Sequence, residues 1–166
     1  MKGQKEYISD ASLKDRAAKR SLRLVFPKLG PKFKVPRDVQ TDVLGELIVA
    51  KPKLAFLQLP TGTGKSPIAL TYSRMLKSPF TVITTATLSL QEQYLSDFPG
   101  IAMLKGKGNF PCTLGKGVTA ATAPCTLFAG VQCDSDYYEQ ERKYEQASEV
   151  ITNYSLYLSE LMYGNR

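Results

Sequence analysis

The sequence predicts an α/β fold built around a parallel sheet. Short apolar runs, of which the one at 80–84 is β-branched, alternate with segments whose apolar residues recur at helical spacing. One such run, at 53–59, leads through a glycine-rich turn into a segment of helical character that begins at Gly64. Strands that alternate with helices pair in parallel, because each helix carries the chain back to the same end of the sheet.

The expected elements follow in order along the chain. Apolar runs predict strands at 53–59, 80–84, 101–104 and 149–152. Helical periodicity predicts helices at 11–24, 37–50, 64–76, 88–98, 137–148 and 155–162. Glycine, proline and cysteine punctuate 105–135, which shows little periodicity and is therefore expected to be an insertion rather than a core element.

The turn after the first expected strand has the composition of a phosphate-binding loop. It reads LQLPTGTGKS over 57–66, and its glycines allow successive N–H groups to point at one phosphate. In such a loop the lysine reaches the β- and γ-phosphates and the serine hydroxyl holds Mg²⁺. The alternative is a Gly/Thr turn that happens to precede a lysine, since Leu59 stands where the general pattern has glycine. The expected ATP-binding residues here are Thr61, Gly62, Thr63, Gly64, Lys65 and Ser66.

Composition limits what surrounds this loop. A chain of 166 residues with 43% hydrophobic residues suits one globular core, and no apolar run approaches transmembrane length. The amino-terminal residues MKGQKEYISD have no apolar stretch, so they are not a secretory signal. Three cysteines and no histidine argue against a disulfide framework and against histidine-dependent catalysis. We expect no membrane association and a cytoplasmic location, or a nuclear one in a eukaryote.

The net charge of +7 is concentrated at the amino-terminal end. Residues 1–37 hold 11 Lys/Arg and 3 Asp/Glu, whereas 38–166 hold 11 and 12. A basic arm over 1–35 suits contact with a phosphate backbone. A solvated leader segment explains the same charge equally well.

Two polar constellations flank the loop. Arg37 and Gln40 stand three apart at the start of a helix, and a glutamine amide can pair with the N6 and N7 atoms of adenine. The alternative is an ordinary surface turn of a helix. Downstream, hydroxyls and amides at a strand-to-helix junction can bond a nucleic-acid backbone, although Thr87 also suits simple N-capping. The expected DNA-contacting residues are Thr85, Ala86, Thr87 and Gln91.

Five motifs occur in a set order along the chain. They are RxxQ at 37–40, LPTGTGKS at 59–66, TATLSLQEQ at 85–93, LKGKGNFPC at 104–112 and ITNY at 151–154. In order and spacing they resemble the start of the XPD- and DinG-like iron–sulfur helicases of superfamily 2, which often lack the leading glycine of the loop. The resemblance runs from about residue 36 to the carboxyl end. It implies an ATP-dependent DNA helicase that moves on single strands, with ATP and Mg²⁺ as ligands.

The resemblance also implies a domain organisation. A basic arm at 1–35 would precede a RecA-like P-loop domain with a parallel sheet, begun at 36–104 and resumed at 137–166. A cysteine-containing insertion at 105–136 would interrupt it. In the family, four cysteines of this insertion hold a [4Fe–4S] cluster. The corresponding residues here are Cys112, Cys125 and Cys133, with Asp136 near the place of the fourth. A three-iron cluster, a zinc site and no metal are the alternatives.

An ATPase of this type also needs an acidic pair to hold Mg²⁺ and position water. The chain has no histidine and no apolar strand that ends in Asp-Glu, so we expect an incomplete motor domain that lacks its second RecA-like domain. We expect little hydrolysis by the chain alone. The alternative function is a non-hydrolysing accessory module that binds nucleotide or single-stranded DNA. A small P-loop kinase is disfavoured, because 105–135 contains no arginine for a lid.

Overall fold

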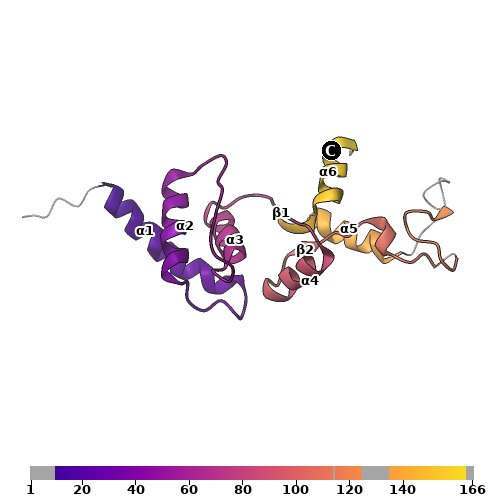
Figure 1. The fold of residues 1–166 in the computed structure, drawn as a ribbon, viewed down its shortest axis with the longest axis horizontal. Helices are drawn as coiled ribbons and strands as arrows, with labels where there is room; N and C mark the ends of the chain where they lie inside the picture. Colours follow the sequence, from indigo (N-terminus) through magenta and orange to yellow (C-terminus); the bar gives the residue numbers. More distant parts are fainter. Residues whose placement is uncertain (1–9, 114, 125–134, 164–166) are drawn as a thin grey trace, which may run out of the picture. The chain divides into compact units, whose positions relative to one another are not determined.

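A computed structural model describes residues 10–113, 115–124 and 135–163. The chain divides into two compact units, Met1–Ser78 and Pro79–Arg166. The first unit is helical and the second contains the sheet (Figure 1). Across the described residues the architecture is therefore α/β with a parallel sheet, as the sequence predicts.

The first unit is built from three α-helices and a short 3₁₀ helix. These are α1 (Asp10–Val25), η1 (Phe26–Leu29), α2 (Asp38–Ala50) and α3 (Lys65–Met75). The three α-helices contact one another pairwise. Apolar side chains from all three helices meet in one buried cluster of Leu22, Leu44, Leu47 and Ile68. Burial of this shared core is what holds the short helices together, because helices of this length are marginal alone.

The helix predicted at 11–24 is confirmed by α1, and this has a consequence for the basic segment. Leu22, Phe26 and Leu29 are each at most 2% exposed. Phe26 also meets the Phe33 ring edge to face, at a centroid distance of 6.0 Å. Leu22, Phe26 and Leu29 of the basic segment are thus part of the core of the unit, so this segment is not only a solvated leader.

The strand predicted at 53–59 is wrong, since residues 51–60 form no helix or strand. Leu54 and Phe56 are 73% and 89% exposed. Leu57 and Leu59 instead pack, half-buried, against the helical core of the unit. A strand needs a partner to bond its N–H and C=O groups, and no described residue pairs with this segment. An extended apolar run can thus pack some of its side chains against helices instead of pairing with the strands of a sheet.

The second unit contains a three-stranded parallel sheet of order β1-β3-β2. Its strands are β1 (Thr81–Thr85), β2 (Ala102–Met103) and β3 (Glu149–Asn153). Ile83 pairs with Ile151, and Met103 pairs with the same residue from the other side. Three of the four predicted strands are therefore confirmed, each within a few residues.

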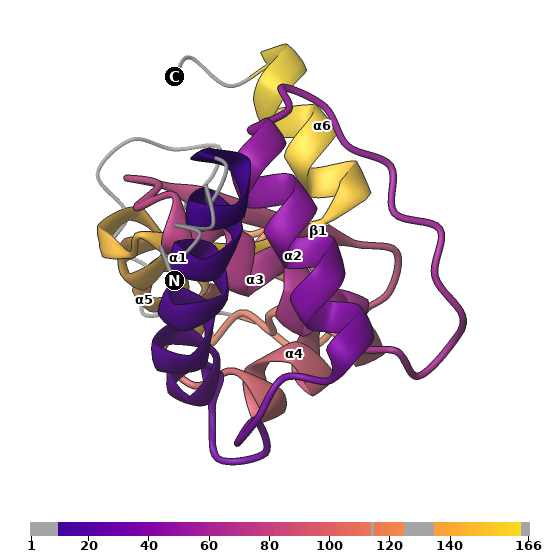
Figure 2. The same cartoon turned by 90° about the vertical axis from the view of Figure 1, so that its left-hand side faces the viewer.

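Helices cover this sheet on both faces. They are α4 (Leu88–Asp97), α5 (Asp136–Gln146) and α6 (Tyr154–Tyr163). Both views of the ribbon place α4 and α6 on opposite sides of the sheet (Figures 1 and 2). Val150 of the central strand is buried in a cluster with Leu104, Tyr137 and Tyr144. The short helix η2 (Lys107–Asn109) follows the strand β2.

The described part of the predicted insertion is irregular, as its composition indicates. It includes an antiparallel bridge between Pro111 and Thr119, and Cys112 N donates to the Val118 carbonyl at 2.8 Å. Ala120 is fully buried against the sheet cluster. These contacts fix the described part of 105–124 onto the unit. No helix in the described ranges is long and apolar enough to cross a membrane.

Candidate functional site

The turn between Pro60 and α3 has the backbone conformation that its glycines allow. Gly62 and Gly64 have φ values of +79° and +82°, in the left-handed region that L side chains rarely adopt. Between them, Thr63 Oγ1 donates to the Pro60 carbonyl at 2.7 Å. The turn is therefore closed by its own side chain and reversed at both glycines.

The helix α3 begins directly at the end of this turn, with Gly64 as its N-cap residue. N–H groups in the first turn of a helix have no carbonyl inside the helix to bond, and they carry the positive end of the helix dipole. Lys65 and Ser66 supply these groups, while Pro67 has no N–H to offer. An anion at this position would meet oriented donors from the backbone.

The Lys65 amine lies over the same turn. Its Nζ donates to the Leu59 carbonyl at 2.7 Å and to the Pro60 carbonyl at 3.2 Å. An ammonium group has three N–H donors, so one remains for another acceptor such as a phosphate oxygen. The sequence motif did not indicate these carbonyl contacts, because they depend on how tightly the turn closes.

Arg37 and Gln40 brace this turn from the start of α2. Gln40 Oε1 accepts from Arg37 N at 2.9 Å, and Gln40 Nε2 donates to the Thr63 carbonyl at 2.9 Å. The Arg37 guanidinium donates to the Gly62 carbonyl at 2.6 Å. Contacts that span 25 and 23 positions in sequence therefore fix the path of the turn. Gln40 is only 4% exposed, so its brace is protected from water.

The structure thus brings the upstream constellation and the predicted phosphate loop together. The Gln40 amide uses its oxygen and one N–H within the protein, and the pairing with adenine stays a prediction. Thr61 and Lys65 are exposed, while Thr63, Gly64 and Ser66 are half-buried. All eight predicted ATP-binding residues accordingly lie in one unit, at the start of α2, in the turn and in the first residues of α3.

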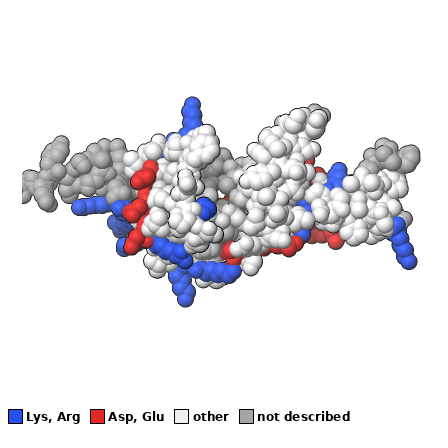
Figure 3. Space-filling view, viewed as in Figure 1, with Lys and Arg blue, Asp and Glu red and all other residues white. Residues whose placement is uncertain are grey.

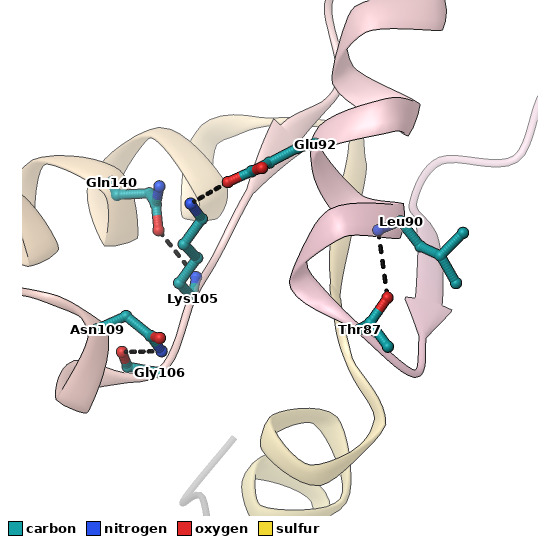
Figure 4. Close-up of polar contacts among 7 residues, drawn as sticks. All are labelled: Thr87, Leu90, Glu92, Lys105, Gly106, Asn109 and Gln140. Carbon is teal, nitrogen blue, oxygen red and sulfur yellow. Dashed lines mark hydrogen bonds and ion pairs between the residues drawn. The ribbon is translucent and has the colours of Figure 1, made fainter.

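The predicted DNA-contacting residues lie at the junction between β1 and α4. Thr87 is the N-cap residue of α4, and its Oγ1 accepts from Leu90 N at 3.3 Å (Figure 4). Thr85 is buried and donates from Oγ1 to the Thr87 carbonyl at 3.2 Å. Ala86 and Thr87 are exposed. The capping alternative is therefore confirmed for Thr87, and contact with DNA stays a prediction.

Gln91, the fourth residue of that group, is fully buried on α4. Neither atom of its side-chain amide has a hydrogen-bond partner among the described residues. A buried amide without partners costs about 1–3 kcal/mol relative to one that is bonded. Packing alone therefore does not explain why a polar side chain occupies position 91 of the second unit.

A polar network that sequence analysis missed fixes the segment after β2. Lys105 Nζ pairs with the Glu92 carboxylate of α4 at 3.0 Å, and Lys105 N donates to Gln140 Oε1 of α5 at 2.8 Å (Figure 4). Asn109 Nδ2 donates to the Gly106 carbonyl at 3.0 Å. The partners lie 13 and 35 positions away from Lys105, so no local pattern could reveal them.

An aromatic cluster lies beside this network. Lys107 Nζ lies 5.1 Å from the centroid of the Tyr137 ring, within the range of a cation–π contact. The Phe110 ring meets Tyr137 edge to face at 5.6 Å. Burial of the Tyr137 phenol, together with its hydrogen bond to Glu141, raises its pKa well above the ordinary value. The Tyr137 phenol is therefore held neutral, as a donor to Glu141.

The predicted metal ligands are only partly described. Cys112 is buried next to the bridge between Pro111 and Thr119, and Asp136 is the exposed first residue of α5. Cys125 and Cys133 lie outside the described residues. Within the described ranges, no three His, Cys, Asp or Glu side chains are grouped so that they could hold a metal ion.

Comparison of the chain with protein-family models, with curated proteins and with solved structures found no match. The braced turn before α3 is the part of the chain in which the largest number of predicted site residues lie together.

Proposed function

We propose that this chain is the amino-terminal, ATP-binding portion of an ATP-dependent DNA helicase with a RecA-like motor domain. The observation that carries the proposal is the turn at 60–66. This turn contains two glycines with positive φ and leads directly into α3, and the Lys65 amine lies over it. This is the combination of backbone donors and one cation that binds nucleotide phosphates in other proteins.

Each residue of the turn has a role in this proposal. The N–H groups of Lys65 and Ser66 would bond phosphate oxygens, and the third N–H of the Lys65 ammonium would meet the β- and γ-phosphates. The Ser66 hydroxyl would bind Mg²⁺. Gln40 would bond the adenine base while Arg37 keeps the turn in place. Bound ATP with Mg²⁺ would supply the phosphoryl group and the counter-charge for the reaction.

In this proposal the second unit contacts single-stranded DNA. The exposed Ala86 and Thr87 lie at the carboxyl end of β1 and the amino end of α4. Neutral donors and a helix N-terminus at such a junction suit phosphate oxygens. The remainder of the motor, including a second RecA-like domain, is the expected partner of the chain, and the cytoplasm is its expected location.

One observation favours the alternative, a module that binds nucleotide or single-stranded DNA without hydrolysis. The three described strands end at Thr85, Met103 and Asn153, and none ends in a carboxylate. Ligands of parallel α/β folds bind at the carboxyl ends of the strands, so carboxylates for Mg²⁺ and water would be needed there. Hydrolysis would therefore need acidic groups from another source.

We also propose that the insertion holds an iron–sulfur cluster through Cys112, Cys125 and Cys133, with Asp136 as the fourth ligand. Of the three cysteines, only Cys112 lies within the described residues. It is buried there, so a thiolate at this position would be shielded from water. Protein purified without oxygen should then be brown, and Cys112→Ser should remove the colour. A colourless protein with one equivalent of zinc would support a zinc site, and one without metal would refute both.

The ATP proposal is tested by binding of Mg²⁺-ATP measured by calorimetry, with Lys65→Ala against Lys53→Ala as a matched control. Both changes remove one exposed lysine of the first unit, but only Lys65 donates into the turn. We expect Lys65→Ala to weaken binding at least tenfold and Lys53→Ala to leave it unchanged. Equal affinities of the two variants would show that the turn is an ordinary Gly/Thr turn.

A further inference from the structure

The first unit carries an uninterrupted basic segment. From residue 16 to residue 37 the sequence contains no aspartate and no glutamate. The basic residues of this segment are Arg16, Lys19, Arg20, Arg23, Lys28, Lys32, Lys34 and Arg37. All of them except the half-buried Lys19 are exposed.

These charges are presented by a folded scaffold. Leu22, Phe26 and Leu29 lie between them in sequence and are buried in the first unit. The Arg74 guanidinium donates to the Lys28 carbonyl at 2.9 Å and so ties η1 to α3. The side chains therefore leave from a fixed backbone, so less conformational entropy is lost when they bind than in a disordered arm.

Three arginines of α1 form a stripe. Arg16, Arg20 and Arg23 are spaced four and three residues apart, so they lie on one side of the helix. None of the three makes an ion pair or hydrogen bond with another described side chain. Their guanidinium groups are free to form bidentate bonds with oxyanions.

An acidic band marks one border of this stripe. Asp38, Asp42 and Glu46 are exposed at intervals of four along α2, and Lys19 Nζ lies 3.9 Å from the Asp42 carboxylate. Within the unit that contains α1 and α2, blue side chains gather beside a band of red ones (Figure 3). The acidic band thus lies on the Lys19 side of α1, and no described carboxylate pairs with the three arginines of the stripe.

We propose that the arginine stripe of the first unit, Arg16, Arg20 and Arg23, together with the exposed Lys28, Lys32 and Lys34 that follow it in sequence, is a docking surface for the phosphodiester backbone of a nucleic acid. It is separate from the Ala86–Thr87 junction of the second unit, and it needs no nucleotide. The contacts are to phosphates rather than to bases, so binding through it is independent of sequence and strongly dependent on salt.

An anionic membrane surface fits these residues less well. A helix that lies on a membrane inserts apolar side chains on the face opposite its charges. Here the apolar residues Leu22, Phe26 and Leu29 are used in the core of the unit. Leu24 and Val35 are the large apolar side chains of 16–37 that are exposed, and two isolated side chains are too few to anchor a helix.

The test uses the whole chain and a fluorescent oligo-deoxythymidine, with affinity measured over a salt series and without ATP. The variant replaces Arg16, Arg20 and Arg23 by glutamine. Three phosphate contacts at ~0.7 each account for roughly 2 in the log–log salt slope. Between about 50 and about 200 mM salt, the parent should therefore lose roughly 20-fold more affinity than the variant.

The matched control replaces Lys51, Lys53 and Lys77 by glutamine. It removes the same three charges from exposed positions of the same unit, so it tests net charge alone and should keep most of the slope of the parent. Slopes that fall equally in both variants would overturn the proposal, as would a parent that binds anionic vesicles or polyglutamate but not the oligonucleotide. Unchanged ATP affinity in the arginine variant separates this result from the fate of the nucleotide site.

Discussion

Gln40 and Gly64 are in close approach: the Nε2 atom of the Gln40 amide lies so near the position of a Cβ on residue 64 that the two atoms would overlap. The same Nε2 donates to the Thr63 carbonyl. The absence of a side chain at position 64 is therefore needed twice, once for the positive φ and once for the approach of Gln40. This relationship connects the start of α2 to the start of α3.

Replacement of Gly64 and Gly62 by alanine separates these two requirements. Both glycines have a φ near +80°, but a Cβ on Gly62 would meet nothing within 4 Å. Gly62→Ala should cost only backbone strain, about 1–2 kcal/mol. Gly64→Ala should cost that and about 1 kcal/mol more, because it displaces the hydrogen bond from Gln40 to Thr63. Urea unfolding measures both differences.

A double-mutant cycle provides the control for this prediction. When Gln40 is already alanine, the extra cost at position 64 should disappear and Gly64→Ala should resemble Gly62→Ala. Additive effects of Gln40→Ala and Gly64→Ala would contradict the close approach of the two residues, since independent sites add.

Gln40→Glu tests the brace through its donor. A carboxylate can still accept from Arg37 N, but it has no N–H for the Thr63 carbonyl and places a negative charge beside that oxygen. We expect a loss of about 1–3 kcal/mol in the free energy of unfolding at neutral pH. The matched control is Gln140→Glu, because among the described residues Gln140 bonds only through its oxygen, as the acceptor from Lys105 N. Equal costs at both positions would show that the bond to Thr63 contributes nothing.

The comparison of Gln40 with the segment at 53–59 shows what sequence could predict. The spacing of Arg37 and Gln40 is also that of an N-cap residue and a glutamine at N3, which can reach back to the N-cap N–H. This local half of the brace could have been predicted, whereas the bond to Thr63 could not. It joins residues 23 positions apart, and no periodicity reports such a distance.

The strand predicted at 53–59 shows what a local apolar pattern leaves undetermined. The apolar run at 54–59 does not specify which of its side chains are covered or by what, since Leu54 and Phe56 stay exposed. In the first unit the partner of Leu57 and Leu59 is a helical core. The strands β1 and β3 were predictable because their β-branched residues, such as Val82 and Ile151, lie in short runs that are flanked by helices.

Tyr137 gives the second unit a defined sensitivity to alkaline pH. Burial and the 2.8 Å bond to Glu141 raise the pKa of Tyr137 above its unfolded value of about 10. The folded state thus favours the neutral phenol, and this contribution to stability is complete below about pH 10 and is lost as the pH rises towards the folded pKa. Tyr137→Phe should cost about 1 kcal/mol at pH 8 from the lost hydrogen bond.

The difference between parent and Tyr137→Phe should then shrink above about pH 10, because phenylalanine has no proton to lose in the unfolded state. Urea unfolding at several alkaline pH values measures it. Tyr154→Phe, at a ring that is 52% exposed, controls for the loss of a phenol elsewhere in the same unit. A difference for Tyr137→Phe that stays constant from pH 8 to beyond about pH 10 would contradict the prediction.

Replacement of Gln91 can show whether this buried residue of α4 contributes to DNA binding or only affects stability. Its amide is fully buried and has no partner among the described residues, so Gln91→Met, which keeps the length of the side chain, should raise the free energy of unfolding by on the order of 1 kcal/mol. The exposed Gln93→Met, two residues along the same helix, controls for intrinsic propensity and should change stability by less than about 0.5 kcal/mol. If Gln91 contacts single-stranded DNA, as its amide at the strand-to-helix junction predicts, the same variant should bind an oligonucleotide several-fold more weakly despite its greater stability. Greater stability with unchanged DNA affinity would instead restrict the DNA contacts of this junction to Ala86, Thr87 and their neighbours on the surface.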